Sequence, residues 1–354
     1  MIRATSGFTF AGSPAGEGVP AAPRAVAWWL LACCALVFAM VVVGGITRLT
    51  HSGLSIVEWQ PILGALPPLD DAQWAETFAK YRKTPEFRLK NFDMTLAGFK
   101  EIFWWEYIHR NLGRVIGLAF FAPFMYFLLR RKLDKPLAWK LAGIFALGAL
   151  QGFMGWYMVA SGLVDDPRVS QFRLAAHLTL AFVIYAAMFW VALGILFPQR
   201  YWTPAGLRSH GSILVVLVFA MVVTGGLVAG IRAGYAYNTF PLMNGHVIPP
   251  EILMIEPWWK NFGYNMATVQ FDHRVVAWLL IFLVPWLWWR TRRAAELDPR
   301  AYFAAHLLLA MLAIQVALGI STLLLRVPVV LGVLHQGVAV LVLTAALWMR
   351  HALR

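Results

Sequence analysis

Eight long apolar segments constrain the fold of this chain more than any other feature of its sequence. Each is long enough to cross the hydrocarbon core of a bilayer, which takes about 20 predominantly apolar residues in a helix. The predicted spans are residues 26–48, 107–129, 140–161, 173–197, 211–231, 272–289, 301–325 and 329–348. The composition agrees, because 60% of residues are hydrophobic and only 13% are charged. We therefore expect an all-α membrane protein with eight transmembrane helices.

The charge pattern predicts how these helices are oriented. The net charge is +13; in a soluble protein it would suggest nucleic acid, but here it gathers in short connections and at the C-terminus, which favours lipid surroundings and no nucleic acid. These basic residues are Arg130, Arg131, Lys132, Lys135, Lys140, Arg200, Arg208, Arg290, Arg292, Arg293, Arg300, Arg350 and Arg354. In an eight-helix count all lie on one side, which the positive-inside rule makes cytoplasmic. We expect a bacterial inner-membrane protein with both termini in the cytoplasm and residues 1–25 as a disordered tail.

Two long loops, 49–106 and 232–271, fall on the opposite, outer side. Both are rich in aromatic residues and proline, unlike disordered linkers, so we expect them to fold as caps. The adjacent Cys33 and Cys34 lie within the first span and cannot form an ordinary disulfide with each other in a helix.

The chain also repeats itself. Glu-Tyr-Ile-His-Arg at 106–110 matches Gln-Phe-Asp-His-Arg at 270–274, and Gln151 matches Gln315. The glycine pair Gly44 and Gly45 matches Gly225 and Gly226 in the fifth span. We predict two fused, pseudo-symmetric four-helix bundles, a known arrangement of membrane proteins. The N-terminal bundle would span 26–200 and the C-terminal bundle 201–354.

Four histidines form the strongest chemical pattern. His109 and His177 lie on the second and fourth spans, and His273 and His335 repeat them in the other half. All four are expected towards the outer, periplasmic side. Two histidines on facing helices suit the axial positions of a heme iron, and a repeated pair is harder to explain as structural packing. His51 and His246, in the outer loops, have no repeat partner and their roles stay open.

Other residues of the repeat fit a heme site. Arg110, Arg274, Arg48 and Arg232 lie beside the histidines or at the outer ends of the glycine-rich spans, and arginine binds carboxylates such as heme propionates in a bidentate manner. The alternative is that such arginines snorkel to the membrane interface, and for Arg48 and Arg232 the two interpretations are evenly balanced. The glycine pairs allow the close approach of a helix or of a porphyrin, and the sequence does not choose between them.

The two halves differ at one informative position. Glu106 lies one helical turn before His109, whereas the matching residue before His273 is Gln270. A carboxylate beside a heme can accept protons or stabilise a developing cation, and an amide cannot accept them. We therefore expect the chemistry in the N-terminal half and electron transfer in the other.

Taken together, these stretches resemble the heme A synthase family, in its proteobacterial and mitochondrial branch, over nearly the whole chain. The matching stretches are Gly-Gly-Ile-Thr-Arg-Leu-Thr-His-Ser-Gly-Leu-Ser at 44–55, Glu-Trp-Gln-Pro-Ile at 58–62, Glu-Tyr-Ile-His-Arg at 106–110, Tyr-Asn-Thr-Phe-Pro-Leu-Met at 237–243 and Val-Gln-Phe-Asp-His-Arg at 269–274. Another branch carries cysteine pairs in its outer loops, and this chain has none there.

The resemblance implies oxidation of one ring methyl of heme O to a formyl group, which gives heme A for terminal oxidases. It implies that His109 and His177 hold the substrate heme O, that His273 and His335 hold a permanent heme b, and that Glu106 is the essential acid. The reaction is a four-electron oxidation. Two successive hydroxylations, or removal of electrons followed by addition of water, would both accomplish it.

Three other functions agree less well with the sequence. A diheme electron-transfer cytochrome predicts equivalent halves, which Glu106 and Gln270 argue against. A transporter would be expected to carry charges at mid-membrane, and the prenyltransferase that makes heme O would need Asp-rich motifs beyond Asp165 and Asp166. Heme O synthase, a terminal oxidase with its assembly factors, and an unidentified electron-transfer protein are the expected partners; the oligomeric state, a homo-oligomer included, stays open.

Overall fold

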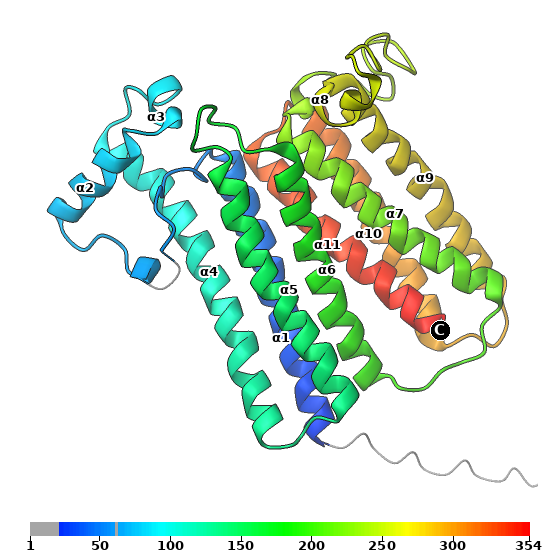
Figure 1. The fold of residues 1–354 in the computed structure, drawn as a ribbon. Helices are drawn as coiled ribbons and strands as arrows, with labels where there is room; N and C mark the ends of the chain where they lie inside the picture. Colours follow the sequence, from blue (N-terminus) through cyan, green and yellow to red (C-terminus); the bar gives the residue numbers. More distant parts are fainter. Residues whose placement is uncertain (1–20, 61–62) are drawn as a thin grey trace, which may run out of the picture.

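The computed structural model describes residues 21–60 and 63–354, and within them eight helices are long and apolar enough to cross a membrane, as predicted. These helices run side by side (Figure 1). They are α1 (Ala21–Leu49), α4 (Leu96–Leu129), α5 (Lys135–Ala160), α6 (Gln171–Leu196), α7 (Ala205–Gly230), α9 (Met266–Arg293), α10 (Pro299–Leu324) and α11 (Val329–Ala352). Most of the predicted N-terminal tail lies outside the described residues, and α1 already begins at Ala21.

Several helices extend beyond the predicted apolar spans. The clearest case is α4, which begins at Leu96 rather than near residue 107, because the Thr95 side chain caps it by accepting a hydrogen bond from the Gly98 amide. Its first turns carry Phe99 and Phe103, which pack against the first long loop rather than into lipid. His109 therefore lies well inside a helix and not at its start, which gives its ring a rigid support.

The order of helix contacts places the histidine-bearing helices diagonally. In the first four spans, α1 and α5 each pack against both α4 and α6. In the last four, α7 and α10 each pack against both α9 and α11. In the first set, α4 and α6 therefore occupy opposite corners, and in the second set α9 and α11 do so.

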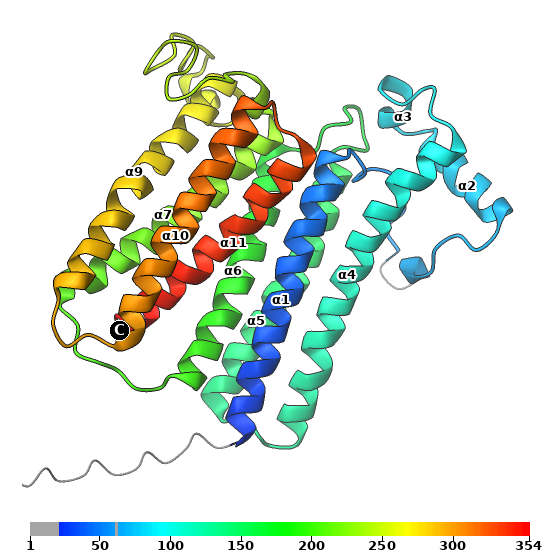
Figure 2. The ribbon, with the colours of Figure 1, turned by 180° about the vertical axis from the view of Figure 1, so that it is seen from behind.

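The two sets meet along α6 and α11, with α7 packed on α6 and α1 packed on α11; the two views in Figures 1 and 2 agree on this arrangement. Gly226 brings α7 so close to α6 that a Cβ there would lie 2.8 Å from the Cα of Ala175. Side-chain hydrogen bonds also link α6 to α11 and α11 to α1. Tyr185 on α6 lies 2.7 Å from Thr344 on α11, and Gln336 donates to the carbonyl of Val41 on α1 at 2.7 Å.

The first long loop is folded, in keeping with its aromatic content. It contains α2 (Asp71–Tyr81) and α3 (Pro85–Leu89), which lie beside the start of α4 (Figure 1). Trp74 and Tyr81 of this cap pack with Phe99 and Phe103 of α4 in a cluster of their own. The loop between α7 and α9 lies at the same end of the helices, opposite the C-terminus (Figure 2). Cys33 and Cys34 are buried and free, as predicted.

The contact between the two helix sets generates a stability prediction. We expect Gly226→Ala to lower the melting temperature by a few degrees, because relieving the 2.8 Å approach to Ala175 requires backbone movement and overpacking costs roughly 1–3 kcal/mol. Gly143→Ala is the matched control, since a Cβ there meets no described atom within 4 Å. Thermal unfolding in detergent measures both, and equal melting temperatures would contradict the predicted strain.

The cap also contains a buried carboxyl group, Glu86, which accepts a hydrogen bond from the Tyr81 hydroxyl. Burial raises the pKa of Glu86 to about 7, and the nearby Glu106 adds to this. Lys90, Tyr81 and Arg232 act in the opposite direction. Because the pKa is raised in the folded state, the stability that this group contributes is present below its ordinary pKa and is lost as pH rises through about 7.

We therefore expect hydrogen exchange of the α2–α3 amides to speed up between about pH 5 and pH 8, beyond the intrinsic effect of pH. Glu86→Gln should reduce this dependence, because the amide has no charge to bury. Glu76→Gln, an exposed position on α2, is the control and should behave as wild type. Identical profiles for Glu86→Gln and wild type would rule out this origin.

Candidate functional site

The four predicted histidines lie on the diagonal helices of each set. His109 is on α4 and His177 on α6; His273 is on α9 and His335 on α11. Within each pair the two rings are close enough for their charges to influence each other. The structure thus brings together the residues that the sequence paired.

Each of these rings rests against a glycine of a neighbouring helix. A Cβ at Gly44 would lie 3.1 Å from the Nε2 of His109, and one at Gly225 would lie 3.3 Å from the Cε1 of His273. The other two rings make the same kind of contact. These are His177, 3.1 Å from a Cβ at Gly155, and His335, 2.9 Å from a Cβ at Gly319, both measured to Cε1. All four glycines leave room for the imidazole where a side chain would displace it.

This contact answers the question that the sequence left open about the glycine pairs. The neighbour of Gly44 and of Gly225 is a histidine ring, whereas Gly45 faces the Gln336 side chain and Gly226 faces α6. Gly155 and Gly319 were not singled out from the sequence. Their separation of 164 residues (319 − 155) equals that of His109 and His273 (273 − 109), and this signal could have identified them.

The hydrogen bonds of the rings differ between the pairs. The Nδ1 of His273 lies 2.9 Å from the Thr224 hydroxyl. Gln151 donates to the backbone carbonyl of His177 at 3.1 Å, and its Nε2 lies 3.4 Å from the ring Nε2. The Nδ1 atoms of His177 and His335 are both enclosed by the protein, that of His177 without a hydrogen-bond partner among the described residues.

A ring nitrogen enclosed by the protein cannot itself reach a heme iron, so the Nε2 atom of the same ring would be the one to coordinate it. Paired imidazoles from facing helices are a donor set that suits heme iron, and the residues present therefore fit a heme in each helix set.

Glu106 is buried and accepts four hydrogen bonds. Its Oε1 accepts from Arg110 Nε at 3.0 Å and Nη2 at 2.7 Å. Its Oε2 accepts from the Ser55 hydroxyl at 2.7 Å and from the Ile56 amide at 2.8 Å. Four donors, two of them from a guanidinium, suit an ionised carboxylate. The same contacts fasten the start of the first long loop to α4, so Glu106 has a structural role that its sequence position did not predict.

In the other half, Gln270 and Arg274 likewise fasten a loop to a helix, here the loop between α7 and α9 to α9. Gln270 donates to the Ala233 carbonyl at 2.7 Å and accepts from Arg274 at 2.9 Å. Arg274 also donates to the carbonyls of Tyr237 and Thr239 at 2.9 and 3.0 Å. The side-chain amide of Gln270 can donate to the loop carbonyl of Ala233, whereas the carboxylate of Glu106 accepts from loop donors.

Arg110, like Arg274, binds loop carbonyls. It donates to the carbonyl of Ile56 at 2.7 Å and to that of Glu58 at 3.0 Å. The structure therefore places both arginines on loop carbonyls. Binding of propionates by Arg110 and Arg274 stays a prediction that would require these bonds to rearrange.

Arg48 and Arg232 lie at the junction of the two helix sets, where their charges interact. Arg48 donates to the Ala229 carbonyl at 3.0 Å, and its Nε is inaccessible and has no partner among the residues described. Arg232 lies 3.4 Å from the Nδ1 of His51. Burial and these two arginines, with Lys90, lower the pKa of His51. This concentration of positive charge suits carboxylate ligands such as propionates.

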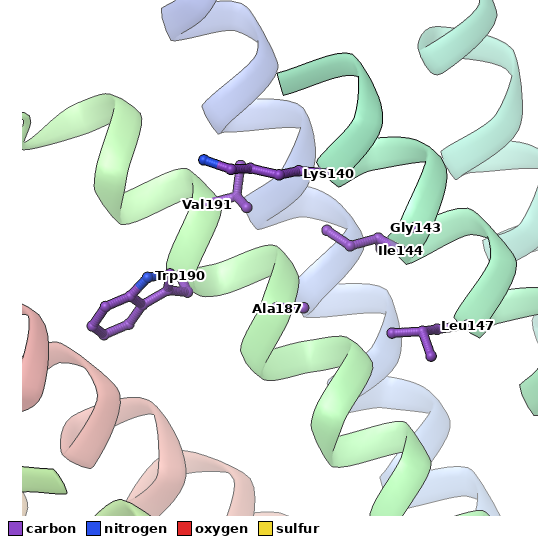
Figure 3. A pocket seen from close by; sticks show the side chains of 7 residues that line it. All are labelled: Lys140, Gly143, Ile144, Leu147, Ala187, Trp190 and Val191. Atoms are coloured by element: carbon purple, nitrogen blue, oxygen red, sulfur yellow. The ribbon is translucent and has the colours of Figure 1, made fainter. Parts of the chain in front are cut away.

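A separate groove of about 540 Å³ lies between α5 and α6, away from the four histidines (Figure 3). Its lining consists of Lys140, Gly143, Ile144, Leu147, Ala187, Trp190 and Val191. Apart from Lys140 and the Trp190 indole these side chains are aliphatic or absent, so the groove offers little for chemistry.

The fold and these contacts define a class: a helical multi-pass membrane protein with two partly buried histidine pairs, in which each ring lies against a glycine. Comparison with known proteins gives the family. The family model described as cytochrome oxidase assembly protein (COX15-CtaA) matches residues 27–347.

Curated relatives of the chain are named heme A synthase. The relative from Nitrosospira multiformis is 62% identical over 94% of this chain and 95% of its own length. Those from Nitrosomonas eutropha and Parvibaculum lavamentivorans are 58% and 47% identical over 91% and 95% of this chain, and over 92% and 96% of their own. The chain belongs to the heme A synthase family.

The glycine contacts predict the effect of a single methyl group. We expect Gly319→Ala to weaken heme binding by the His273/His335 pair about tenfold, because the added Cβ would meet the His335 ring at 2.9 Å and overpacking has a cost of this order. The pyridine hemochrome assay gives the heme-to-protein ratio after dilution, with Gly143→Ala as control. Unchanged heme retention in Gly319→Ala would show that the ring does not need this contact.

Proposed function

We propose that the protein is a heme A synthase, an oxidoreductase that converts heme O to heme A by oxidising a ring methyl to a formyl group. The observation that carries the proposal is the pair of histidine sites, four partly buried rings that each rest on a glycine. Relatives with this name align over more than nine-tenths of the chain, which supports the same activity.

We assign the substrate heme O to His109 and His177 and a permanent heme b to His273 and His335. A bound heme b supplies one-electron transfer. Two differences between the halves support the assignment. Glu106 stands where the other half has Gln270, and Thr224, which holds the His273 ring, stands where the first half has Val43. A ring fixed by a hydroxyl suits a cofactor that stays, and a less restrained ring suits a substrate that leaves.

Glu106 would act as the acidic residue of the substrate half. Its four hydrogen-bond donors suit a charged carboxylate one turn from His109, so it can stabilise positive charge that develops as electrons leave the substrate. The same contacts hold the first long loop closed over this part of α4. Both effects depend on one side chain, and a test must separate them.

The proposal includes the organisation of the chain in the membrane. Residues 26–200 and 201–354 would be the two halves of a fused repeat, in an inner membrane, with both termini cytoplasmic and the histidines near the periplasmic side. The long loops lie at one end of the helices and the basic short connections at the other (Figure 1), which supports this orientation. Arg48 and Arg232 remain our candidates for binding propionates.

Partners are also proposed. Heme O would arrive from heme O synthase, and heme A would pass to a terminal oxidase or its assembly factors, in keeping with the family's description. An unidentified electron-transfer protein would accept or donate the electrons that the reaction requires. A diheme electron-transfer cytochrome, the main alternative, would have no need of Glu106 in one half only, and the comparisons do not favour it.

Extraction and chromatography of heme from the purified protein test the activity. Expression with a source of heme O should give heme A or its hydroxylated precursor, and expression without it should give heme B alone. Heme B under both conditions would favour the electron-transfer cytochrome.

Glu106→Gln should keep heme bound but stop formyl formation, since the neutral amide carries no negative charge to stabilise a cation and cannot accept a proton. Ser55→Ala is the matched control, because it removes a loop contact of Glu106 and leaves the carboxylate in place. We expect Ser55→Ala to retain most of the heme A yield. Equal loss in both variants would mean that Glu106 acts by anchoring the loop, and normal yield in Glu106→Gln would refute its assignment.

A further inference from the structure

The groove between α5 and α6 combines an apolar lining with one positive charge (Figure 3). Lys140 is the charged residue of the lining, and its side chain extends from α5 towards α6. Lys140 is exposed, and in the part of the chain that the structure describes it has no hydrogen-bond or ion-pair partner. A cation beside a hydrocarbon-lined groove suits a ligand that is both apolar and anionic.

The groove lies near one end of the two helices that form it. On α5 its lining runs from Lys140, the sixth residue of the helix, to Leu147, which is about 10 Å at 1.5 Å per residue. On α6 it includes Trp190, six residues before the helix ends at Leu196. One leaflet holds roughly 15 Å of hydrocarbon. The groove therefore fits within a single leaflet, with Lys140 towards the water.

The end of α11 packs against the same part of α6. The His351 ring lies edge-on to the Trp190 indole, with 5.2 Å between the centroids. Arg354 donates to the Phe197 carbonyl, and its Nη1 would lie 3.8 Å from a Cβ at Gly194. Gly194 follows Trp190 by four residues, so it continues that side of α6 by one turn. The Arg354 guanidinium thus lies one turn beyond the groove lining, at the end where Lys140 lies.

Arginines crowd this end of the helices. Burial, with the positive charges of Arg200 and Arg300 close by, lowers the pKa of Arg354. Asp298 is also near, but it forms an ion pair with Arg300. Like charges that are held together repel one another, and an anion placed among them removes much of that cost. The charges therefore favour a ligand with a net negative headgroup over a zwitterionic one.

We propose that this groove binds an anionic phospholipid, with an acyl chain between α5 and α6 and the phosphate on Lys140 and Arg354. Basic sites between the ends of transmembrane helices suit such headgroups. A free phosphate would leave the apolar lining without a partner. Because Lys140 belongs to the first set of four helices and Arg354 to the second, one lipid would join the two sets. This site is separate from the histidine sites and does not depend on the proposed activity.

Substitutions can separate the headgroup contacts from the acyl-chain contacts. Lys140→Gln and Arg354→Gln each remove one charge, and Lys140→Arg keeps it. Gly143→Leu fills the groove, because Gly143 lines it and a Cβ there meets no neighbouring atom of the described residues within 4 Å. Lys135→Gln is the matched control. Lys135 is exposed on the same helix, does not line the groove, and lies about 140° around the helix from Lys140.

The measurement is native mass spectrometry of the purified protein with its heme, delipidated in detergent and titrated with dioleoyl phosphatidylglycerol or dioleoyl phosphatidylcholine. These lipids have the same acyl chains and differ in headgroup charge. We expect wild type to prefer phosphatidylglycerol. Lys140→Gln and Arg354→Gln should each weaken its binding about fivefold, the effect of one cation beside an anionic headgroup, and leave phosphatidylcholine unchanged. Lys140→Arg and Lys135→Gln should match wild type, and Gly143→Leu should weaken both lipids.

Equal binding of the two lipids by wild type would overturn the proposal, as would phosphatidylglycerol binding that Lys140→Gln leaves unchanged. Displacement of the lipid by inorganic phosphate alone would show a phosphate site instead. An oligomer that Gly143→Leu dissociates, with lipid binding unchanged, would show that a second copy of the chain covers the groove. The heme content and melting temperature of each variant report whether it is folded, so a selective loss of phosphatidylglycerol from folded Lys140→Gln protein supports the site.

Discussion

Close approach of an imidazole ring to a bare helix backbone is the contact on which this structure depends. Each candidate ligand histidine projects from a corner helix and lies against a glycine of the next helix, at 2.9 to 3.3 Å from where a Cβ would be. In a membrane, where apolar side chains gain little by leaving lipid, such small-residue contacts are a main source of helix association. The same contact therefore helps to hold neighbouring helices together and fixes the orientation of the histidine rings.

Much of this was accessible from the sequence. The eight spans could be predicted from the length of the apolar segments, and the four histidines and their pairing from the internal repeat. Both signals lie in the sequence itself and require no knowledge of which residues are neighbours in space. The start of α4 was predicted too late, since Phe99 and Phe103 pack against a folded loop and not against lipid. The loop contacts of Arg110 and Arg274 were not predicted either, because a guanidinium binds backbone carbonyls as readily as carboxylates and only tertiary structure decides which it meets.

The two sets of four helices differ at a few positions that the sequence repeat predicts to be equivalent. Glu106 meets loop donors and Gln270 meets a loop acceptor, so each residue matches its own loop as well as its own site. Thr224 restrains a ring in one half where Val43 leaves it without a hydroxyl in the other.

The contact between α6 and α11 has a kinetic consequence. His177 and His335 lie on these two helices, which pack together and are joined by the bond between Tyr185 and Thr344. Their contact thereby fixes the separation of the two histidine sites. With a heme at each site, as proposed, a change that widened the contact between α6 and α11 would slow electron transfer between the two hemes while leaving the four histidines in place.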